Sequence, residues 1–449
     1  MPSPRADTLA DRDLGGFLGE AALSLYGAAG RLGAPIAGAV LRWRARDGKE
    51  DIAHRGERWG VAGQSRPQGP LVWVHCASVG ETNAALPLID RLASRGPTLL
   101  LTTGTVTAAE VARPRLPRGA IHQFVPIDTP TAVRRFLDHW RPSLAIFAES
   151  ELWPTMLRAL QRRALPLAVV NARMSERSFR SWRRFAPFAR AVLSRADLFL
   201  AQTPADAERL RALGADRVLV CGNLKFDVPP PFADPAAIEA MRGKIAGRPV
   251  LVAASTHPGE EATVIAAHKE LRAGGVRLLT IVAPRHRERG EAVAALVEGA
   301  GLTLGRRSRG DEVGDGTDVY LADTIGEMGL WYGLADIAFL GGSMVPHGGQ
   351  NPIEPAKLGV PIIHGSHVGN FREVYDALTT AKATAAVSDA ATLAAVVKLL
   401  IENPGERRRL SHDALDCVGR FTGALDRTLD ALESYLAPLC HGHEASARA

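Results

Sequence analysis

The chain has 449 residues, of which 46% are hydrophobic and 23% charged, with a formal net charge of +6 and a pI near 9.3. This composition excludes an intrinsically disordered chain, and the length suffices for two or three domains that each bury a core. A basic chain can bind nucleic acid, anionic lipid or an anionic substrate, but no run of Lys and Arg with interleaved aromatics and no nucleic-acid-binding module is present, so we expect no nucleic acid partner.

Residues 1–47 form the first predicted region, in which residues 14–41 are mostly apolar. Glu20, Arg31 and Pro35 interrupt this run, whereas a membrane span needs about 20 consecutive apolar residues. Three arginines and a tryptophan follow it directly. We therefore expect an N-terminal membrane-associated helix that lies in the interface and can be deleted without unfolding the rest. A true span, with those arginines keeping the chain in the cytoplasm, and an ordinary packed helix are the alternatives.

Apolar strand-like runs then alternate with helical patterns through a first domain, residues 48–228. Its strands are predicted at residues 71–77, 98–103, 120–126, 144–148, 165–171 and 198–202, and the apolar run at residues 218–221 is also strand-like. Four prolines in the seven residues 229–235 predict a linker, which we place at residues 229–237.

The alternation restarts in a second domain, residues 238–435, before a tail at residues 436–449. The strands of this domain are predicted at residues 250–254, 277–283, 319–321, 337–340 and 361–364. Strands and helices in turn predict parallel sheets covered on both faces. The fold class is thus α/β, with two Rossmann-like doubly wound domains facing across a cleft.

Ligands of such sheets bind beyond the carboxyl ends of the strands, so the loops there are the places to look for chemistry. In the first domain these loops carry Glu81 in Ser78–Thr82, Glu149 in Glu149–Pro154, and Lys225 in Gly222–Asp227. Carboxylates at strand ends are costly to bury and seldom serve packing. Each also has an ordinary explanation, because a helix start favours an acid and a lone lysine is usually solvated.

The second domain offers Pro284-Arg285 after a strand, and Ile325-Gly326-Glu327 in the loop Asp323–Met328. An arginine there would present a fork of donors to a phosphate. Four glycines in Gly341–Gly349 precede Asn351-Pro352-Ile353-Glu354. These glycines predict a loop that lets a phosphate approach the backbone, followed by a helix with Asn351 as its N-cap. A capping box that involves Glu354 is the alternative.

Together these motifs resemble those of the 3-deoxy-D-manno-octulosonic acid (Kdo) transferase family. The resemblance extends from about residue 20 to residue 435 and includes Arg55–Gly60, Asn171–Ser175 and Ser255–Glu261. It implies the GT-B fold and transfer of Kdo from a CMP-Kdo donor to a lipid A precursor, lipid IVA. It also implies that the protein acts at the cell inner membrane, on the cytoplasmic side.

Carried over position by position, Glu81 matches the family's general base, and Glu149 and Lys225 match its transition-state stabilisers. The family's CMP-contacting positions are matched by Pro284, Arg285, Ile325, Gly326, Glu327, Asn351, Pro352, Ile353 and Glu354. The chain departs from the family pattern at Ser150, where Thr is common, and over residues 306–317. We expect neither departure to touch a matched residue.

The leaving group of such a donor is a nucleoside monophosphate, which one Arg, one Lys and a helix N-terminus can stabilise without a divalent ion. The only Asp-x-Asp, residues 11–13, precedes the apolar segment and follows no strand. We therefore expect no metal and no other cofactor. A sugar-nucleotide 2-epimerase of the same fold is the rival enzyme, although it needs no membrane segment. A basic binding protein is the non-enzymatic rival, although carboxylates at the strand ends would repel phosphate.

Overall fold

The structure, a computed structural model, describes residues 9–440. Contacts divide the chain into two compact units, of which unit 1 combines the residues up to Val228 with those from Thr422 onward. Unit 2 is the continuous segment Pro229–Phe421. The chain therefore leaves unit 1 at the first prolines of the predicted linker and returns to it near the C-terminus.

Unit 1 is built on a seven-stranded parallel sheet of order β3-β2-β1-β4-β5-β6-β7. The strands are β1 (Leu71–Cys76), β2 (Thr98–Thr103), β3 (Ile121–Phe124), β4 (Leu144–Ala148), β5 (Leu167–Ala172), β6 (Leu198–Ala201) and β7 (Val218–Val220). The helices are α1 (Leu9–Leu32), α2 (Ala34–Arg46), α3 (Val79–Ala93), α4 (Val106–Ala112), α5 (Pro130–Trp140), α6 (Pro154–Arg162), α7 (Glu176–Arg183), α8 (Ala186–Leu193), α9 (Pro204–Ala212) and α18 (Ala424–Cys440). The strand order reverses between β1 and β4, which makes this the topological switch point of a doubly wound sheet.

Both faces of the unit 1 sheet are buried, as expected for parallel strands with continuous apolar runs. Trp73 of β1 packs on one face against the rings of Phe136 and Phe147, with centroid distances of 4.7 and 4.8 Å. Val72 and Val74 point to the other face, into a cluster that includes residues of α3 and α18. The two clusters fix the sheet, so the loops after its strands have a rigid base.

Helix α1 packs on unit 1 and belongs to its core. Leu23 is 2% exposed and lies in the hydrophobic cluster beneath α5, α6 and α8. A Cβ on Gly19 would lie 2.6 Å from the carbonyl oxygen of Pro187, so α1 and α8 are in close contact. Glu20 forms an ion pair with Arg195. We expected that this helix can be removed without unfolding the rest, but because its deletion would uncover core residues, we now expect the deletion to destabilise unit 1.

Within the described residues, no helix is both long enough and apolar enough to span a membrane. The contacts of Leu23 and Gly19 agree with the packed-helix alternative for one face of α1. The opposite face is apolar and exposed, since Leu18, Leu25 and Leu32 are 49%, 73% and 82% exposed. Their seven-residue spacing puts them in one stripe along the helix.

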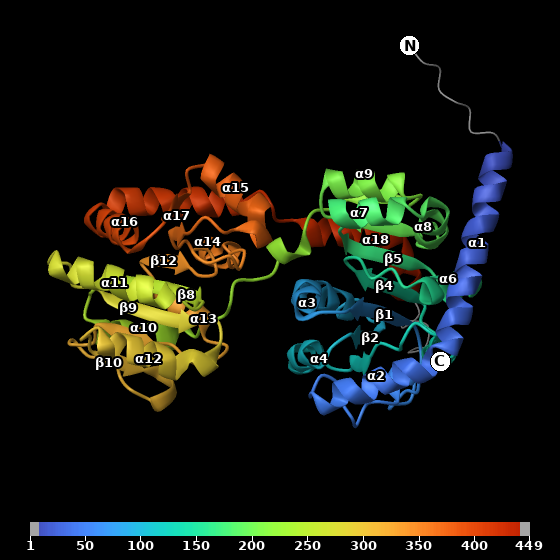
Figure 1. Cartoon of the computed structure of the whole chain (residues 1–449), viewed down its shortest axis with the longest axis horizontal. Coiled ribbons are helices and arrows are strands. Elements are labelled where there is room, and N and C mark those ends of the chain that lie inside the picture. The colour runs from blue at the N-terminus through green and yellow to red at the C-terminus, as the bar shows by residue number, and fades with distance from the viewer. Residues whose placement is uncertain (1–8, 441–449) are drawn as a thin grey trace, which may run out of the picture. The chain divides into compact units, whose positions relative to one another are not determined.

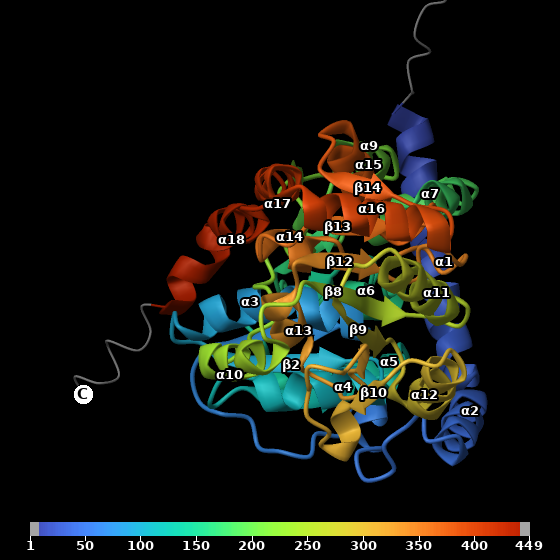
Figure 2. The same ribbon diagram turned by 90° about the vertical axis from the view of Figure 1, so that its left-hand side faces the viewer.

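Unit 2 is built on a second seven-stranded parallel sheet, of order β10-β11-β9-β8-β12-β13-β14. The strands are β8 (Val250–Thr256), β9 (Leu279–Pro284), β10 (Leu304–Arg306), β11 (Val319–Leu321), β12 (Ile337–Leu340), β13 (Ile362–His364) and β14 (Thr384–Ala386). The helices are α10 (Pro235–Ile245), α11 (Glu260–Ala273), α12 (Gly290–Gly299), α13 (Met328–Leu334), α14 (Ile353–Lys357), α15 (Arg372–Thr380), α16 (Ala390–Glu402) and α17 (Pro404–Gly419). Figure 2 shows α11 and α12 on one side of this sheet and α10 and α13 on the other. Its switch point lies between β8 and β12.

Two parallel-sheet α/β units confirm the predicted fold class. The sequence prediction missed β10 and β14, which have three residues each and lie at the two edges of the second sheet. Three residues are too few to show an alternating or apolar pattern. The pattern of β10 is further obscured because the strand ends in Arg306.

Helix α18 corrects the expected end of the second domain. Residues up to 435 were assigned to that domain, but Leu429, Leu432 and Leu436 are buried in the unit 1 core against α3. In Figure 1, α18 (red) lies among the blue and green elements of unit 1. Asp227 ties its start to unit 1, because its carboxylate accepts from the backbone N–H groups of Gly423 and Leu425 at 2.7 and 2.5 Å. Of the predicted tail, residues 436–440 are part of α18 and residues 441–449 lie outside the described residues.

Candidate active site

Glu81 lies at the start of α3, directly beyond the carboxyl end of β1. Ser78 is the N-cap of this helix, and its hydroxyl oxygen accepts from the Glu81 N–H at 3.3 Å. The Glu81 carboxylate accepts from the Ala77 N–H at 2.7 Å and from the Ser78 hydroxyl at 2.8 Å. This resembles a capping box, except that the Glu81 carboxylate accepts from the N–H of Ala77, which precedes the N-cap, and not from the N–H of Ser78. Glu81 is thus an acid at a helix start, as the ordinary explanation states. The same hydrogen bonds also fix the orientation of its carboxylate.

The environment of Glu81 favours its protonated form. Burial raises the pKa of Glu81 above its ordinary value, and the charges of Glu149 and Glu151 raise it further. The hydrogen bonds from Ala77 and Ser78 act in the opposite direction without cancelling the shift. A carboxylate with a raised pKa is a stronger base, which suits the removal of a proton from a hydroxyl group.

Glu149 and Lys225 form an ion pair beside Glu81, with 2.8 Å between Nζ and Oε1. Glu149 is the first residue after β4 and has a φ of 56°, a left-handed conformation that is strained for a residue with a Cβ. Lys225 lies in a short 3₁₀ helix whose first residue, Leu224, donates its N–H to Asn171 at 3.0 Å. The structure therefore brings the three predicted catalytic residues together at the switch point of unit 1.

A further residue of this site, His75, was given no role from the sequence. His75 of β1 is fully buried, with Nε2 3.7 Å from a carboxylate oxygen of Glu151. The Trp153 indole N–H donates to Glu151 at 2.7 Å. Burial raises the pKa of Glu151, but the hydrogen bond and charge of His75 outweigh this effect and leave it lowered. The signal in the sequence was the histidine inside an otherwise apolar strand.

In unit 2, Arg285 is exposed directly after β9, and Glu354 is half-buried in α14. Burial raises the pKa of Glu354 above its ordinary value. A hydrogen bond from Asn351 and the charges of Arg285 and Lys357 act in the opposite direction but do not cancel this shift. The Asn351 side chain donates to Glu354 at 3.1 Å and accepts from the Ile353 N–H at 3.0 Å. The residues matched to CMP contacts after β9 and around α14 thus act on one another electrostatically.

Helix α14 differs from the expected capped helix. It has five residues and begins at Ile353, with Pro352 preceding it. So short a helix has only a weak macrodipole, so a phosphate near it depends mainly on side chains.

The Gly-rich loop after β12 also differs from expectation. Its N–H groups were expected to face a phosphate, but those of Gly342, Ser343 and Met344 donate to the carboxylate of Glu260 at 2.7, 3.0 and 2.9 Å. Glu260 is fully buried. A Cβ on Gly341 would lie 2.5 Å from the carbonyl oxygen of Ser255, so packing of the loops after β8 and β12 explains this glycine.

The loop after β11 carries the remaining matched residues. Ile325 is 76% exposed and Gly326 has a φ of 88°. The Glu327 carboxylate is held by the guanidinium of Arg307, with 2.6 Å between Nη2 and Oε1. Arg307 lies within residues 306–317, which we expected to touch no matched residue. That expectation was wrong, because β10 and β11 are neighbours in the sheet.

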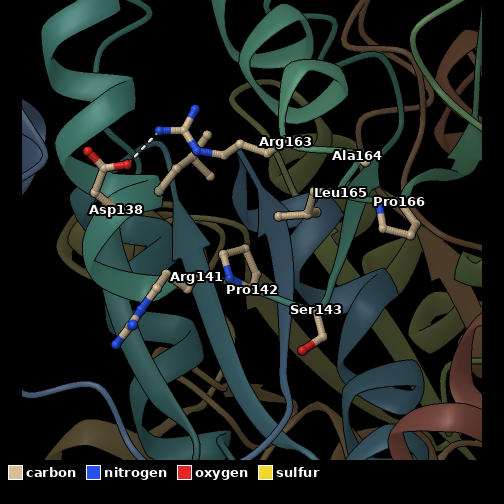
Figure 3. Close-up of a pocket in the computed structure, with 9 residues that line it drawn as sticks. Asp138, Arg141, Pro142, Ser143, Arg163, Ala164, Leu165 and Pro166 are labelled. Carbon is tan, nitrogen blue, oxygen red and sulfur yellow. Dashed lines mark hydrogen bonds and ion pairs between the residues drawn. The ribbon is translucent and has the colours of Figure 1, made fainter.

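A cavity of about 550 Å³ lies elsewhere in unit 1. Ser143 and Pro166, which line it, directly precede β4 and β5. Figure 3 shows the ion pair between Asp138 and Arg163, 2.6 Å long, at this cavity. These strands are parallel, so the cavity is at the opposite edge of the sheet from Glu149 and takes no part in the candidate site.

Solved structures with the same two-unit architecture define the class of protein. A glycosyltransferase from Rickettsia africae matches with a TM-score of 0.56 and 12% identity, covering 82% of this chain and 99% of that one. A UDP-GlcNAc 2-epimerase from Neisseria meningitidis matches with a TM-score of 0.55 and 13% identity, covering 81% and 100%. The fold is thus GT-B, and it does not by itself separate transferases from epimerases.

The sequence comparisons separate them. The family described as 3-deoxy-D-manno-octulosonic-acid transferase (kdotransferase) matches residues 53–228. A 3-deoxy-D-manno-octulosonic acid transferase from Bordetella pertussis is 41% identical over 391 residues, covering 84% of this chain and 91% of the relative. The chain belongs to the 3-deoxy-D-manno-octulosonic acid transferase family, which confirms the resemblance seen in its motifs, and it is a glycosyltransferase.

Proposed function

We propose that this enzyme transfers Kdo from CMP-Kdo to the glucosamine disaccharide of a lipid A precursor, lipid IVA, without a divalent ion. In this reaction the bond between the anomeric carbon of Kdo and the phosphate oxygen breaks as an acceptor hydroxyl attacks that carbon. The hydroxyl proton passes to Glu81, and CMP leaves. The carrying observation is that Glu81, in a member of this family, is oriented at the switch point with a raised pKa.

Glu149 and Lys225 act in this proposal as transition-state stabilisers. Their ion pair holds the ammonium group of Lys225 within 2.8 Å of Glu149, so its position is fixed before the reaction. A preorganised positive charge stabilises negative charge that develops on a leaving phosphate. Lys225 would supply charge that a divalent ion supplies in other transferases.

The nucleotide binds to unit 2 in this proposal, at Pro284, Arg285, Ile325–Glu327 and Asn351–Glu354. The exposed guanidinium of Arg285 can form a bidentate pair with the phosphate. Glu354 can accept a hydrogen bond from a ribose hydroxyl while the Asn351 side chain donates to its Oε1. Because the Gly-rich loop donates to Glu260, side chains carry most of this recognition.

The reaction itself is tested by incubating the full-length enzyme with CMP-Kdo and lipid IVA in the presence of EDTA. We expect CMP release and a lipid product heavier by one or more Kdo units in mass spectrometry. Release of CMP without a Kdo-bearing lipid would contradict the proposed acceptor. Activity that disappears with EDTA and returns with Mg²⁺ would contradict the proposed independence of metal.

We also propose that unit 1 attaches to the cytoplasmic surface of the inner membrane through the exposed apolar stripe of α1. This stripe consists of Leu18, Leu25 and Leu32, and Trp43 of α2, which is 60% exposed, continues the apolar surface. Apolar side chains beside basic ones favour an interfacial position at anionic lipid.

Helix α7 is basic and, like α1, contacts α8. Tyr26 of α1 and Trp182 of α7 both contact Phe188 of α8, with centroid distances of 6.4 and 6.1 Å. Arg177, Arg180, Arg183 and Arg184, on and beside α7, are exposed. Helix α7 thus adds a cluster of positive charge to unit 1, which would favour attachment to anionic lipid.

The membrane proposal is tested with substitutions on the exposed face of α1, because deletion of α1 would disturb the core. Replacing Leu18, Leu25 and Leu32 together with Gln should move most of the protein from the pellet to the supernatant when it is centrifuged with vesicles of anionic phospholipid. The matched control replaces Leu296, Leu399 and Leu415, which are 41%, 50% and 42% exposed on unit 2, and should leave the distribution unchanged. Full sedimentation of the α1 variant would contradict the proposed surface.

A further inference from the structure

The segment that follows β10 is fastened to the loop that follows β11. Asp323 is the anchor, because its carboxylate receives the Arg306 guanidinium at 2.6 Å, the Ser308 N–H at 3.0 Å and the Ser308 hydroxyl at 2.7 Å. The Asp323 side chain is 2% exposed. A buried carboxylate with three donors fixes the two segments against each other.

Arg307 lies between these anchors and holds Glu327. Its Nη2 donates to Oε1 of Glu327 at 2.6 Å, and its Nε lies 3.2 Å from both carboxylate oxygens. The hydroxyl of Thr324 donates to Oε2 of the same carboxylate. The guanidinium also lies 5.7 Å from the ring centroid of the buried Trp331. Both side chains of the pair are thus confined before any ligand binds. Because the Arg307 Nε–H is shared between the two oxygens, three donor protons contact the carboxylate and leave about one of its four lone-pair positions for a ligand.

The pair has a chemical consequence for an anionic ligand. A free carboxylate in a nucleotide site repels phosphate, whereas a carboxylate paired with a guanidinium presents an acceptor with little net charge. The hydrogen bonds from Arg307 and Thr324, with the charge of Arg307, lower the pKa of Glu327. The pair therefore favours the ionised form of Glu327, which can only accept hydrogen bonds.

We propose that Arg307 is a positioning residue of the nucleotide site, which orients Glu327 to accept a hydrogen bond from a neutral donor of the bound nucleotide. A cytidine nucleotide offers two such donors, the ribose hydroxyls and the exocyclic amine of the base. The inference rests on the proposed function, which places the nucleotide at Ile325–Glu327. It assigns a role to the part of the chain that departs from the family pattern.

The neighbouring Arg309 provides a matched control. It belongs to the same short 3₁₀ helix, its side chain is 59% exposed, and it forms an ion pair with Glu291 at 3.6 Å. Replacing it removes the same charge from the same segment without removing a donor to Glu327. An effect of total charge or of segment stability should therefore appear when either Arg307 or Arg309 is replaced. Loss of the orientation of Glu327 should appear only when Arg307 is replaced.

The experiment measures CMP binding by calorimetry in the full-length wild type, R307A, R307K and R309A. We expect R307A to weaken CMP binding at least about tenfold and R309A to leave it unchanged. R307K should recover part of the loss, since lysine restores the charge but not the fork. In turnover assays the KM for CMP-Kdo should rise in R307A, while the KM for the lipid acceptor stays constant.

A pH series separates positioning from a merely structural effect. Without Arg307 the pKa of Glu327 returns toward its ordinary value, so more of the carboxyl group is protonated as the pH falls. CMP affinity of R307A should therefore fall further between about pH 5.5 and about pH 4 than that of the wild type, because an ordinary glutamate titrates in that range. Equal pH dependence in both proteins would overturn the inference.

Ligand variants identify the donor. In E327Q, loss of the preference for CMP over UMP indicates the exocyclic amine, and loss of the preference for CMP over 2′-deoxy-CMP indicates the ribose. Both preferences retained at wild-type strength would overturn the role of Glu327. The double variant R307A/E327Q should bind no more weakly than E327Q alone, because Arg307 acts through Glu327.

The outcomes also distinguish this inference from the proposed function. Wild-type CMP affinity in R307A, with affinity lost in R285A and E354A, overturns the inference and leaves the nucleotide site in place. Wild-type affinity in all three overturns the nucleotide site itself. If R307A does not fold, R307K replaces it in the test, because a lysine cannot offer two N–H donors to the Glu327 carboxylate at once. An unchanged KM for CMP-Kdo in R307K then overturns the inference.

Discussion

Glu81 and Glu260 occupy equivalent places in the two units and use their carboxylates differently. Each lies in the first turn of the helix that follows the strand at the switch point, α3 after β1 and α11 after β8. Glu260 accepts from four backbone N–H groups, those of His257, Gly342, Ser343 and Met344. Glu81 accepts from Ala77 and Ser78 of its own loop.

A carboxylate has about four lone-pair positions for hydrogen bonds. In Glu260 these are filled by the backbone, so this residue joins two loops and has no capacity left for a substrate. Within the described part of the chain, Glu81 retains capacity, and its pKa is raised by burial. The same position in the fold therefore serves structure in one unit and, as we propose, chemistry in the other.

The largest expected effect is on turnover in Glu81→Gln. This substitution keeps the size of the side chain and removes the base, so kcat should fall by about 10²–10⁴, with CMP affinity unchanged. Initial rates of CMP release measure kcat, and calorimetry measures the CMP affinity. An unchanged unfolding transition must accompany the loss. Near-normal turnover would leave Glu81 as a helix-start acid only, and Glu149→Gln would be tested next.

The partner experiment is Glu260→Gln, in which the loss should be of stability. An amide nitrogen in place of one oxygen leaves two buried N–H groups unpaired, at a cost of about 3 kcal/mol. Denaturant unfolding should show this loss, and hydrogen exchange should locate it in the loops after β8 and β12. A variant that is fully stable but inactive would contradict the structural role of Glu260.

A smaller effect is expected in the nucleotide loops. Arg285→Ala and Glu354→Ala should each weaken CMP binding by about 1–3 kcal/mol, because each removes a hydrogen bond to or from a charged group. Arg287→Ala, which removes an exposed arginine two residues further on, is the control. Unchanged CMP affinity in both variants would sink the assignment of the nucleotide to these loops.

The smallest effect concerns pH. Glu81 acts as a base only when ionised, so kcat/KM should fall toward acid with a midpoint above the ordinary pKa of a glutamate, in the direction of its raised pKa. Glu151→Gln removes one charge that raises this pKa, so the midpoint should move to lower pH. Because burial is the larger cause, the movement should be small. A movement to higher pH would contradict the electrostatic coupling.

The sequence was sufficient to predict the strands that flank the site and the loops that carry it. The strands β1 and β4 are continuous apolar runs, and the acids that follow them are conspicuous. The use made of backbone donors could not be predicted, since a Gly-rich loop has the same sequence whether it faces a phosphate or the carboxylate of Glu260. The Arg307–Glu327 pair was missed because it depends on a three-residue edge strand.

The return of α18 to unit 1 has a consequence for the order of folding during synthesis. Unit 2 is contiguous from Pro229 to Phe421, so all of it is available before the ribosome has made Leu429, Leu432 and Leu436. Unit 1 begins first but completes its core last, because these leucines close the face that carries α3. A released fragment that ends at Phe421 should thus contain a complete unit 2 and a unit 1 with an open core, the form most in need of a chaperone.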